Sequence, residues 1–499
     1  MKSMKKICHI LFAVAAVVLC ALPLFGMAVA PTMTTTENRT LASFPVLQDE
    51  DGSFNVDFLS DLGTYFTDHF AGKNDLVAID SQIQSKVFHE SSVSTILVGE
   101  NDWLYYTDSL DDYLGENVVT ERGAYNIAHN IKLMQAKAEQ SGVDFLFTVA
   151  PNKNSLYDEN MPSQYSVKAS ESNNIALVSE ELTALEVPYA DLYAAFRAQD
   201  EILYCTQDSH WNQKGAVLAY TTIREALGKK AVDYNTEADV VHTKLEAGDL
   251  ATSLYSIYAE PEWNYRYEYT SKVKFEEGED WESQWIQTTR KKGKKSLLMF
   301  RDSFGISLCP YIAEDYAAGA FSRNTVYMMD SYMEQVQPDT LIVEIVERNL
   351  DRFGVFTLDS QRSTGPAIMV GPTSDADISQ ASAASDEVIG ATTLSCTESM
   401  LLPTYRILSG SIDESMIEKD TNVYVQVTDG DKTTLYEAYT TSCAGDEAGI
   451  WKDNGYLLYL DSEEILSDEI GVMVLTEKDG VFTVVGETAC AMTEVTDGE

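Results

Sequence analysis

The feature that most constrains the fold is a regular alternation of helical and strand-like segments between residues 124 and 346. The predicted helices cover residues 124–138, 175–185 and 215–227, and one more begins at 194. The predicted strands cover residues 143–149, 187–192, 295–300, 325–329 and 340–346. Short, largely apolar strands that alternate with helices are typical of a parallel sheet buried on both faces. The sequence therefore predicts an α/β fold in which helices flank a parallel sheet.

The N-terminus has the pattern of an export segment. Lys2, Lys5 and Lys6 precede an apolar run over residues 7–30, which ends in the small-x-small sequence Ala28-Val29-Ala30. The run is also long enough to span a bilayer if it is retained. Residues 1–30 are therefore predicted to be a signal peptide or a membrane anchor. Either one implies an extracytoplasmic protein, secreted or anchored at the cell surface.

Composition excludes several function classes. The formal net charge of −44 repels nucleic acid, so we expect no nucleic-acid partner. The 7 cysteines show no C-x-x-C spacing, so neither a zinc nor an iron–sulfur site is predicted. We expect no cofactor. One disulfide could form among the cysteines of the last hundred or so residues.

The chain divides into regions by composition. Residues 31–358 form the predicted α/β domain, interrupted at 230–292 by a polar, aromatic insertion that we interpret as a hairpin near the site. Residues 359–386, rich in Ser, Ala, Asp, Thr and Gly, are a predicted linker. Residues 387–499 contain short apolar runs separated by Asp/Gly turns, which predicts a small β-sandwich domain.

Ser303 lies where a nucleophile would be exposed. The apolar run at 296–300 is followed by Asp302-Ser303-Phe304, and residues 305–308 can open a helix. A Ser at such a strand-to-helix turn lies near outward-pointing backbone N–H groups. This geometry suits a nucleophile whose oxyanion must be stabilised.

Asp208 and His210 form the second candidate motif, in Asp208-Ser209-His210-Trp211-Asn212. A carboxylate two residues before a His can hold Nδ1–H and leave Nε2 free as a base. Together with Ser303 they could form a triad, which is recognised by roles rather than by chain order. The alternatives are a packed His before a helix capped by Asn212, and a metal site. The metal site would need further ligands, which no H-E-x-x-H or similar spacing supplies, so no metal is predicted.

Four motifs carry a resemblance to a known family. They are Asp102-Trp103-Leu104-Tyr105-Tyr106, Val149-Ala150-Pro151-Asn152-Lys153, Asp208-Ser209-His210-Trp211-Asn212 and Arg301-Asp302-Ser303-Phe304-Gly305. Over about residues 37–352 the chain resembles the AlgX/AlgJ-type polysaccharide O-acetyltransferases and the related DHHW proteins of the SGNH hydrolase superfamily. The order Asp, His, then Ser is similar to the permuted topology of that group.

The resemblance implies roles for individual residues. Ser303 would be the nucleophile, His210 the general base and Asp208 the residue that orients it. For the oxyanion, the Ser303 backbone N–H is the first candidate and Asn152 the second. Asn152, Lys153 and Trp211 are candidates for oxyanion or substrate contacts, with a structural role as the alternative for each. Arg301 departs from the small residue common at its position, and the C-terminal region does not match the carbohydrate-binding module of AlgX.

The resemblance implies an enzyme that moves an acetyl group through an acyl-serine onto hydroxyls of an exported or cell-wall polysaccharide. It also implies a membrane-bound O-acyltransferase as the source of acetyl groups. Two alternatives remain: an SGNH-type carbohydrate acetylesterase, in which water accepts the acetyl group, and an inert cell-surface glycan-binding or scaffold protein.

Overall fold

The structure is a computed structural model that describes most of the 499-residue chain, including the four family motifs, whereas Ala28-Val29-Ala30 of the predicted export segment lies outside the described residues. The described residues are 2–27, 41–48, 52–170, 172–324, 327–355, 357–359, 362–364, 367–383, 395–398, 404–444, 451–465, 467 and 469–491.

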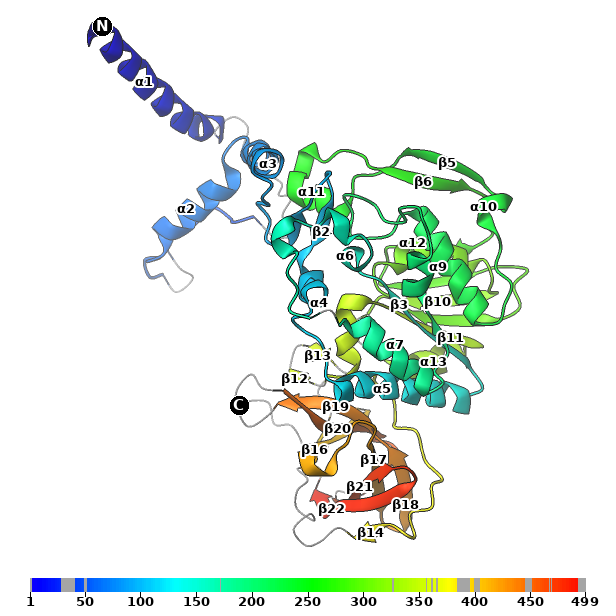
Figure 1. Cartoon of the computed structure of the whole chain (residues 1–499). Coiled ribbons are helices and arrows are strands. Elements are labelled where there is room, and N and C mark those ends of the chain that lie inside the picture. The colour runs from blue at the N-terminus through cyan, green and yellow to red at the C-terminus, as the bar shows by residue number, and fades with distance from the viewer. Residues whose placement is uncertain are drawn as a thin grey trace.

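A 7-stranded sheet with the order β4-β3-β11-β9-β10-β8-β7 forms the centre of the structure (Figure 1). Its strands are β3 (Asp144–Ala150), β4 (Tyr189–Ala190), β7 (Lys274–Phe275), β8 (Trp285–Thr289), β9 (Ser296–Phe300), β10 (Ala318–Ser322) and β11 (Thr340–Val346). Strands β4, β3, β11, β9 and β10 are parallel, whereas β8 and β7 pair antiparallel at one edge. The carboxyl ends of the parallel strands therefore meet at one edge of the sheet, where ligands bind in such folds.

Helices cover both faces of this sheet. One face carries α5 (Glu121–Gln140), α7 (Asn174–Ala184) and α13 (Met329–Val336), and the other carries α8 (Leu192–Arg197), α9 (Gln213–Ala226) and α12 (Gly305–Ala313). In β11, Leu341 and Val343 pack into the first core while Ile342 and Val346 pack into the second. Successive strand residues point to opposite faces, so a strand buried on both sides must be apolar throughout. The predicted α/β fold is confirmed.

One predicted strand is wrong. The prediction placed a strand at 325–329, but Met329 begins α13, and residues 325–326 lie outside the described residues. The parallel strand of this region is β10, whose sequence Ala-Gly-Ala-Phe-Ser has few of the β-branched side chains that favour strands. A Cβ added at Gly319 would lie 2.8 Å from Thr288 Oγ1 of β8. Close packing against neighbouring strands therefore selects β10, which local propensity does not.

The region 230–292 contains the expected hairpin. Strands β5 (Asp239–Lys244) and β6 (Trp263–Glu268) pair antiparallel, with the short helices α10 (Tyr234–Glu237) and α11 (Asp249–Tyr255) beside them. The rest of the region is not separate from the sheet, because β7 and β8 form its antiparallel edge.

The N-terminal part contributes helices and a small sheet. Its elements are α1 (Lys2–Met27), α2 (Phe58–His69), α3 (Lys73–Ile83), β1 (Ile96–Val98), β2 (Leu104–Tyr106) and α4 (Leu110–Leu114), with α6 (Lys153–Leu156) following β3. Helix α1, blue in Figure 1, projects away from the α/β body. None of the described helices meets the length and hydropathy that crossing a bilayer requires.

The C-terminal region is β-rich, as predicted. Its strands are β14 (Ser382–Ala383), β15 (Ser395–Glu398), β16 (Tyr405–Ser411), β17 (Asn422–Asp429), β18 (Lys432–Glu437), β19 (Tyr439–Ala444), β20 (Trp451–Asp461), β21 (Glu469–Lys478) and β22 (Val481–Ala491), after a small pair β12 (Thr357–Asp359) and β13 (Arg362–Thr364). They form one sheet in the order β14-β22-β21-β17-β18 and a second in the order β15-β16-β20-β19. Val425 of the first sheet and Leu458 of the second pack into one core.

The second of these sheets packs against α5. The buried Asn130 donates to the Thr440 carbonyl at 2.8 Å and accepts from the Thr440 N–H at 3.0 Å. In the segment predicted as a linker, Ala367, Ile368 and Met369 are buried in the same core as α5. The connection is therefore packed over residues 367–369, and the domain boundaries at 358 and 386 stay a prediction.

Among the described residues, Cys205, Cys309, Cys443 and Cys490 are free thiols.

Candidate active site

Ser303 sits in the turn between β9 and α12. Its neighbour Asp302 fixes this turn, because Asp302 Oδ1 accepts the Phe304 N–H at 2.8 Å and Oδ2 accepts the Val346 N–H at 2.7 Å. The Asp302 N–H in turn donates to Glu344 Oε2 at 3.1 Å. Asp302 thus ties the turn to the adjacent strand β11 and leaves the Ser303 side chain partly exposed.

Arg301, the departure from the family pattern, has a structural use. Its buried guanidinium donates to the carbonyls of Trp281 at 3.1 Å and Ser283 at 2.8 Å. The side chain runs past Gly305, where an added Cβ would lie 2.6 Å from Arg301 Cδ. Gly305 is required for this close approach, and Arg301 anchors the loop before β8 beside the nucleophile turn.

Asp208 and His210 lie on the loop that precedes α9. Asp208 Oδ1 accepts both the His210 N–H at 2.9 Å and the ring nitrogen Nδ1 at 2.7 Å. Asn212 caps the helix, since its Oδ1 accepts the Gly215 N–H at 3.1 Å. The helix-capping alternative and the Asp-x-His pair therefore occur together, and the cap fixes the end of the loop that carries His210.

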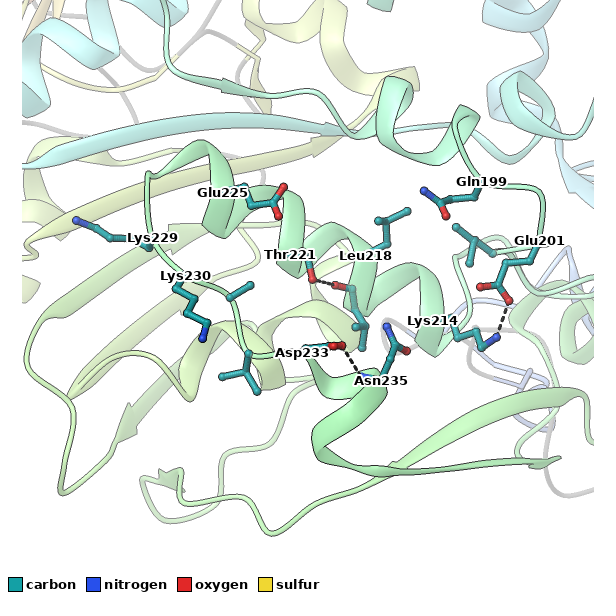
Figure 2. A pocket seen from close by; sticks show the side chains of 14 residues that line it. Gln199, Glu201, Lys214, Leu218, Thr221, Glu225, Lys229, Lys230, Asp233 and Asn235 are labelled. Carbon is teal, nitrogen blue, oxygen red and sulfur yellow. Dashed lines mark hydrogen bonds and ion pairs between the residues drawn. The ribbon is translucent and has the colours of Figure 1, made fainter.

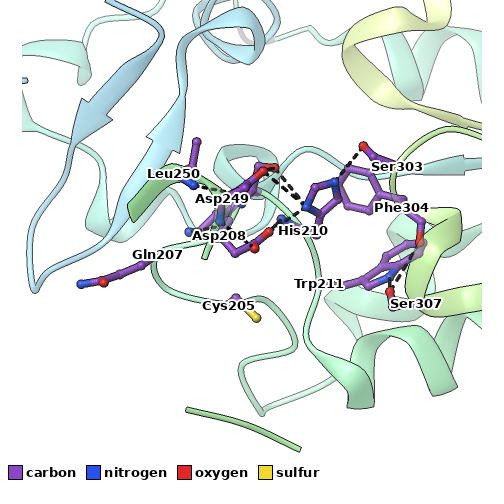
Figure 3. A network of polar contacts seen from close by, with 12 residues as sticks. Cys205, Gln207, Asp208, His210, Trp211, Asp249, Leu250, Ser303, Phe304 and Ser307 are labelled. Carbon is purple, nitrogen blue, oxygen red and sulfur yellow. Dashed lines mark hydrogen bonds and ion pairs between the residues drawn. The ribbon is translucent and has the colours of Figure 1, made fainter. Parts of the chain in front are cut away.

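The fold brings the candidate triad together across 93 residues of sequence. His210 Nε2 lies 2.8 Å from Ser303 Oγ, and Nδ1 faces Asp208 on the other side of the ring (Figure 3). An ionised carboxylate can only accept, so Nδ1 carries the ring hydrogen and Nε2 accepts from the Ser303 hydroxyl. This arrangement can remove a proton from Ser303.

The electrostatics favour ionised Asp208 and a basic His210. Burial alone would raise the pKa of Asp208, but the hydrogen bond and charge of His210 outweigh burial and lower this pKa. Burial alone would lower the pKa of His210, but Asp208 raises it, with smaller contributions from Asp249 and Asp302, and the net shift is upward. A more basic imidazole is a stronger proton acceptor.

Asp249 is a residue of the site that the sequence analysis missed. Its Oδ2 lies 3.6 Å from His210 Nδ1, and its backbone N–H donates to Asp208 Oδ2 at 3.0 Å. Its carboxylate also accepts the Ser209 N–H at 2.7 Å. Asp249 begins α11, inside the region read as an insertion, and no spacing in the sequence links it to His210.

Asn152 belongs to a buried network at the ends of β3 and β11. Its Nδ2 donates to Asp112 at 3.1 Å and its backbone N–H donates to Glu347 Oε2 at 2.7 Å. No described bond of Asn152 reaches Ser303. Among the residues that the structure describes, none accepts the Ser303 N–H, so this donor is free for a ligand.

Lys153 is buried beneath the loop that carries Asp208 and His210, which we call the His loop. Its Nζ donates to the carbonyls of Leu104 at 2.7 Å, Thr206 at 2.7 Å and Asp208 at 3.0 Å. The ammonium also lies 4.9 Å from the centre of the Trp103 ring. Burial lowers the pKa of Lys153 to about 8. The side chain contacts the backbone of Asp208 and is 5% exposed, so it can hold the loop from below.

Trp211 joins the two halves of the site. Its Nε1–H donates to Ser307 Oγ of α12 at 2.7 Å, and its ring packs edge-on against Phe304, with centroids 4.8 Å apart. The indole is buried. Trp211 therefore fixes the His loop onto the helix that follows Ser303.

The fold brings Asp249 beside Asp208 and His210 as a third potential metal ligand. Suitable ligand atoms of Asp208, His210 and Asp249 lie within 4.8 Å of one another. However, Asp208 Oδ1 and His210 Nδ1 are hydrogen-bonded at 2.7 Å, and His210 Nε2 contacts Ser303. Both ring nitrogens of His210 are therefore engaged as in a Ser–His–Asp triad, and this arrangement favours the triad over the metal site.

The cavity shown in Figure 2 is not part of this site. It has a volume of about 450 Å³ and lies along α9, where Lys214, Leu218 and Thr221 line it. None of its lining residues belongs to the candidate triad.

The parallel sheet with Ser303, His210 and Asp208 beside one another is the arrangement that a resemblance to SGNH hydrolase-like proteins implies. In agreement, residues 96–289 match the sequence model of a family described as an SGNH hydrolase-like domain, acetyltransferase AlgX. The matched range includes Asp208 and His210 and ends before Ser303. The resemblance inferred from the motifs is confirmed. No curated protein matches the chain.

Solved structures with similar folds cover about half or more of the chain. A DHHW family protein from Eubacterium siraeum is 17% identical, covering 52% of this chain and 93% of its own, with a TM-score of 0.40. PatB1 of Bacillus cereus is 18% identical, covering 51% and 96%, with a TM-score of 0.41. AlgX of Pseudomonas aeruginosa is 11% identical, covering 74% and 88%, with a TM-score of 0.32.

Proposed function

We propose that this protein is an extracytoplasmic O-acetyltransferase that moves an acetyl group, through an acyl-serine, onto hydroxyls of an exported or cell-wall polysaccharide. The observation that carries the proposal is the 2.8 Å contact between Ser303 Oγ and His210 Nε2, with Asp208 at 2.7 Å on Nδ1. The match to an acetyltransferase family supports acetyl as the transferred group.

In the first half-reaction, His210 Nε2 takes the hydroxyl proton while Ser303 Oγ attacks the acetyl carbonyl. The bond to the donor then breaks, and the leaving group receives the proton from His210. The Ser303 N–H stabilises the oxyanion, and one such donor typically contributes about 10²–10³ in rate. Asp208 holds the imidazole in the required tautomer.

In the second half-reaction, a sugar hydroxyl attacks the acyl-serine and gives its proton to His210 Nε2. The Ser303 ester bond breaks, and Ser303 Oγ recovers the proton. If water replaces the sugar, the same residues perform ester hydrolysis. Asn152, Lys153 and Trp211 act here by holding the strand ends and the His loop in place, since all three are buried and engaged.

The proposed location rests on the N-terminal segment, in which Lys2, Lys5 and Lys6 precede an apolar run. A protein outside the cytoplasm cannot draw directly on cytosolic acetyl-CoA. A membrane-bound O-acyltransferase is therefore the proposed acetyl source.

The direct test is intact-mass detection of an acetyl group on the protein after exposure to an activated acetyl ester. We expect an adduct on Ser303 in the native chain, none in Ser303→Ala, and an adduct in the surface control Ser415→Ala. Loss of labelling in His210→Ala would support the assigned base. Full labelling of Ser303→Ala would refute the mechanism.

The acceptor is decided by product analysis with a glycan present. Acetylated oligosaccharide supports transfer, whereas free acetate alone identifies an esterase. A chelator should leave either activity unchanged, because the proposed steps use no metal.

A further inference from the structure

A second cleft lies between the β5–β6 hairpin and the loop that carries the candidate triad. Its volume is about 500 Å³. Its lining combines residues of the hairpin, the His loop and two turns: Asn101, Asp102, Ile202, Tyr204, Thr206, Gln207, Asn212, His242, Lys244, Glu260, Pro261, Glu262, Trp263 and Tyr265. We call it the hairpin cleft.

One wall of the hairpin cleft is aromatic. His242 pairs with Tyr265 in the strand register, and Trp263 lies two residues before Tyr265, so the three side chains share one face of the hairpin. The His242 ring centre lies 4.9 Å from that of Trp263 and 4.7 Å from that of Tyr265. Lys214 covers the Tyr265 ring at 4.5 Å, whereas Trp263 is 57% exposed. The wall therefore ends in an indole that is open to a ligand.

The cleft and the catalytic loop form one structural unit. Glu262 Oε1 accepts the Gln207 N–H at 2.8 Å and the Thr206 hydroxyl at 2.6 Å, and it also accepts the Thr206 N–H. Gln207 directly precedes Asp208 and points away from His210 in Figure 3. A ligand in the cleft would thus lie against the back of the loop that positions the general base.

The charges of the cleft select against acidic ligands. Asp102 and Glu260 are exposed, Glu262 is partly buried, and Lys244 is the single lysine or arginine in the lining. The whole chain, including these residues, has a formal net charge of −44. A polyanion would be repelled, while carboxylate oxygens are good acceptors for hydroxyl and amine protons.

We propose that the hairpin cleft binds a neutral or amine-bearing glycan. The apolar face of a pyranose ring stacks on Trp263, and sugar hydroxyls donate to Asp102 and Glu260. This combination of an apolar aromatic surface and a few polar groups is what orients a ligand in a pocket. The cleft lies behind the loop that carries His210, so the proposal is a glycan-binding site that does not depend on the proposed function.

The test is calorimetric titration of the full chain carrying Ser303→Ala, which prevents turnover, with chitohexaose, cellohexaose and a polyuronate hexamer. We expect binding of a neutral hexasaccharide and weaker or no binding of the uronate. Adding Trp263→Ala should lower the affinity at least about tenfold, corresponding to roughly 1.4 kcal/mol. Trp451→Ala removes a similarly exposed indole from β20 and should change nothing.

A second variant guards against misfolding of Trp263→Ala. Asp102 has a positive φ of 63°, which Asn tolerates, so Asp102→Asn should keep the turn and weaken binding severalfold. No binding of either neutral glycan, unchanged affinity in both variants, or a preference for the uronate would each overturn the proposal. None of these outcomes depends on the Ser303 adduct, so failure of the cleft and failure of the triad can be told apart.

Discussion

The carboxylate of Asp249 lies 3.6 Å from Nδ1 of His210, beside the Asp208 oxygen that accepts from the same nitrogen at 2.7 Å. Two carboxylates therefore face one imidazole, and the Asp249 backbone N–H holds the second oxygen of Asp208. Asp249 acts through the Asp208–His210 pair, which makes it a positioning residue for the proposed reaction.

Asp249→Asn should lower the pKa of His210, because a negative charge beside the imidazolium is removed while Asp208 and Asp302 remain. The decrease should be smaller than the one caused by loss of Asp208, because Asp208 raises this pKa more than Asp249 does. Since the base must be neutral, the acidic limb of kcat/KM should move to lower pH. NMR titration of the ring, assigned with His210→Gln, gives the pKa without activity. An unmoved pKa would show that Asp249 has only a structural role.

Lys153→Met should destabilise the fold strongly. Met keeps an unbranched, apolar side chain of similar size but lacks the ammonium group. The carbonyls of Leu104, Thr206 and Asp208 therefore lose the donor that they share. We expect a loss of about 3 kcal/mol in the free energy of unfolding, measured by urea denaturation. The control Lys214→Met breaks a more exposed ion pair with Glu201 and should cost less than about 1 kcal/mol. Equal losses would contradict the assigned role.

Glu347 should make stability depend on pH. Burial raises the pKa of Glu347 from 4.5 to about 7, with Asp112 adding to the shift. Between these values the folded state holds a proton that the unfolded state has lost, so stability should fall as pH rises from about 4.5 to 7 and then level off. The difference is at most about 3 kcal/mol.

Glu347→Gln isolates this contribution, because the side chain can no longer ionise. We expect the unfolding free energy of Glu347→Gln to fall less over this pH range than that of the native chain. The exposed control Glu463→Gln should retain the native pH slope. If the slopes of the native chain and Glu347→Gln coincide, the carboxyl is ionised throughout.

The Trp211–Ser307 hydrogen bond should be measurable by a double-mutant cycle. Trp211→Phe keeps an aromatic ring against Phe304 but loses the donor to Ser307 Oγ. Ser307→Ala removes the acceptor of the same bond. We expect each single variant to lower the free energy of unfolding by about 1 kcal/mol, and the double variant to lower it by less than the sum. Thermal or urea unfolding gives the coupling energy, and strict additivity would show that the bond contributes nothing.

The local pattern of apolar and polar residues was enough to predict several elements of the fold and of the candidate site. The apolar run at 340–346 coincides with β11, because a strand buried on both faces must be apolar throughout. The Asp208–His210 contact was also predictable, since two residues on one turn can meet without help from the rest of the chain. The placement of Ser303 followed from the strand before it and the helix after it.

Tertiary structure decided what depends on contacts between distant segments. Strand β10 forms although its sequence has low strand propensity, and at Gly319 the neighbouring strand β8 comes too close for a Cβ. Asp249 reaches His210 from 39 residues away, through a helix whose position follows from packing rather than from spacing. The sequence by itself therefore determined the buried strands β3, β9 and β11 and the three candidate catalytic residues. Only the fold decided that a second carboxylate faces the base and that an aromatic cleft backs its loop, because side chains far apart in sequence meet only when the core is assembled.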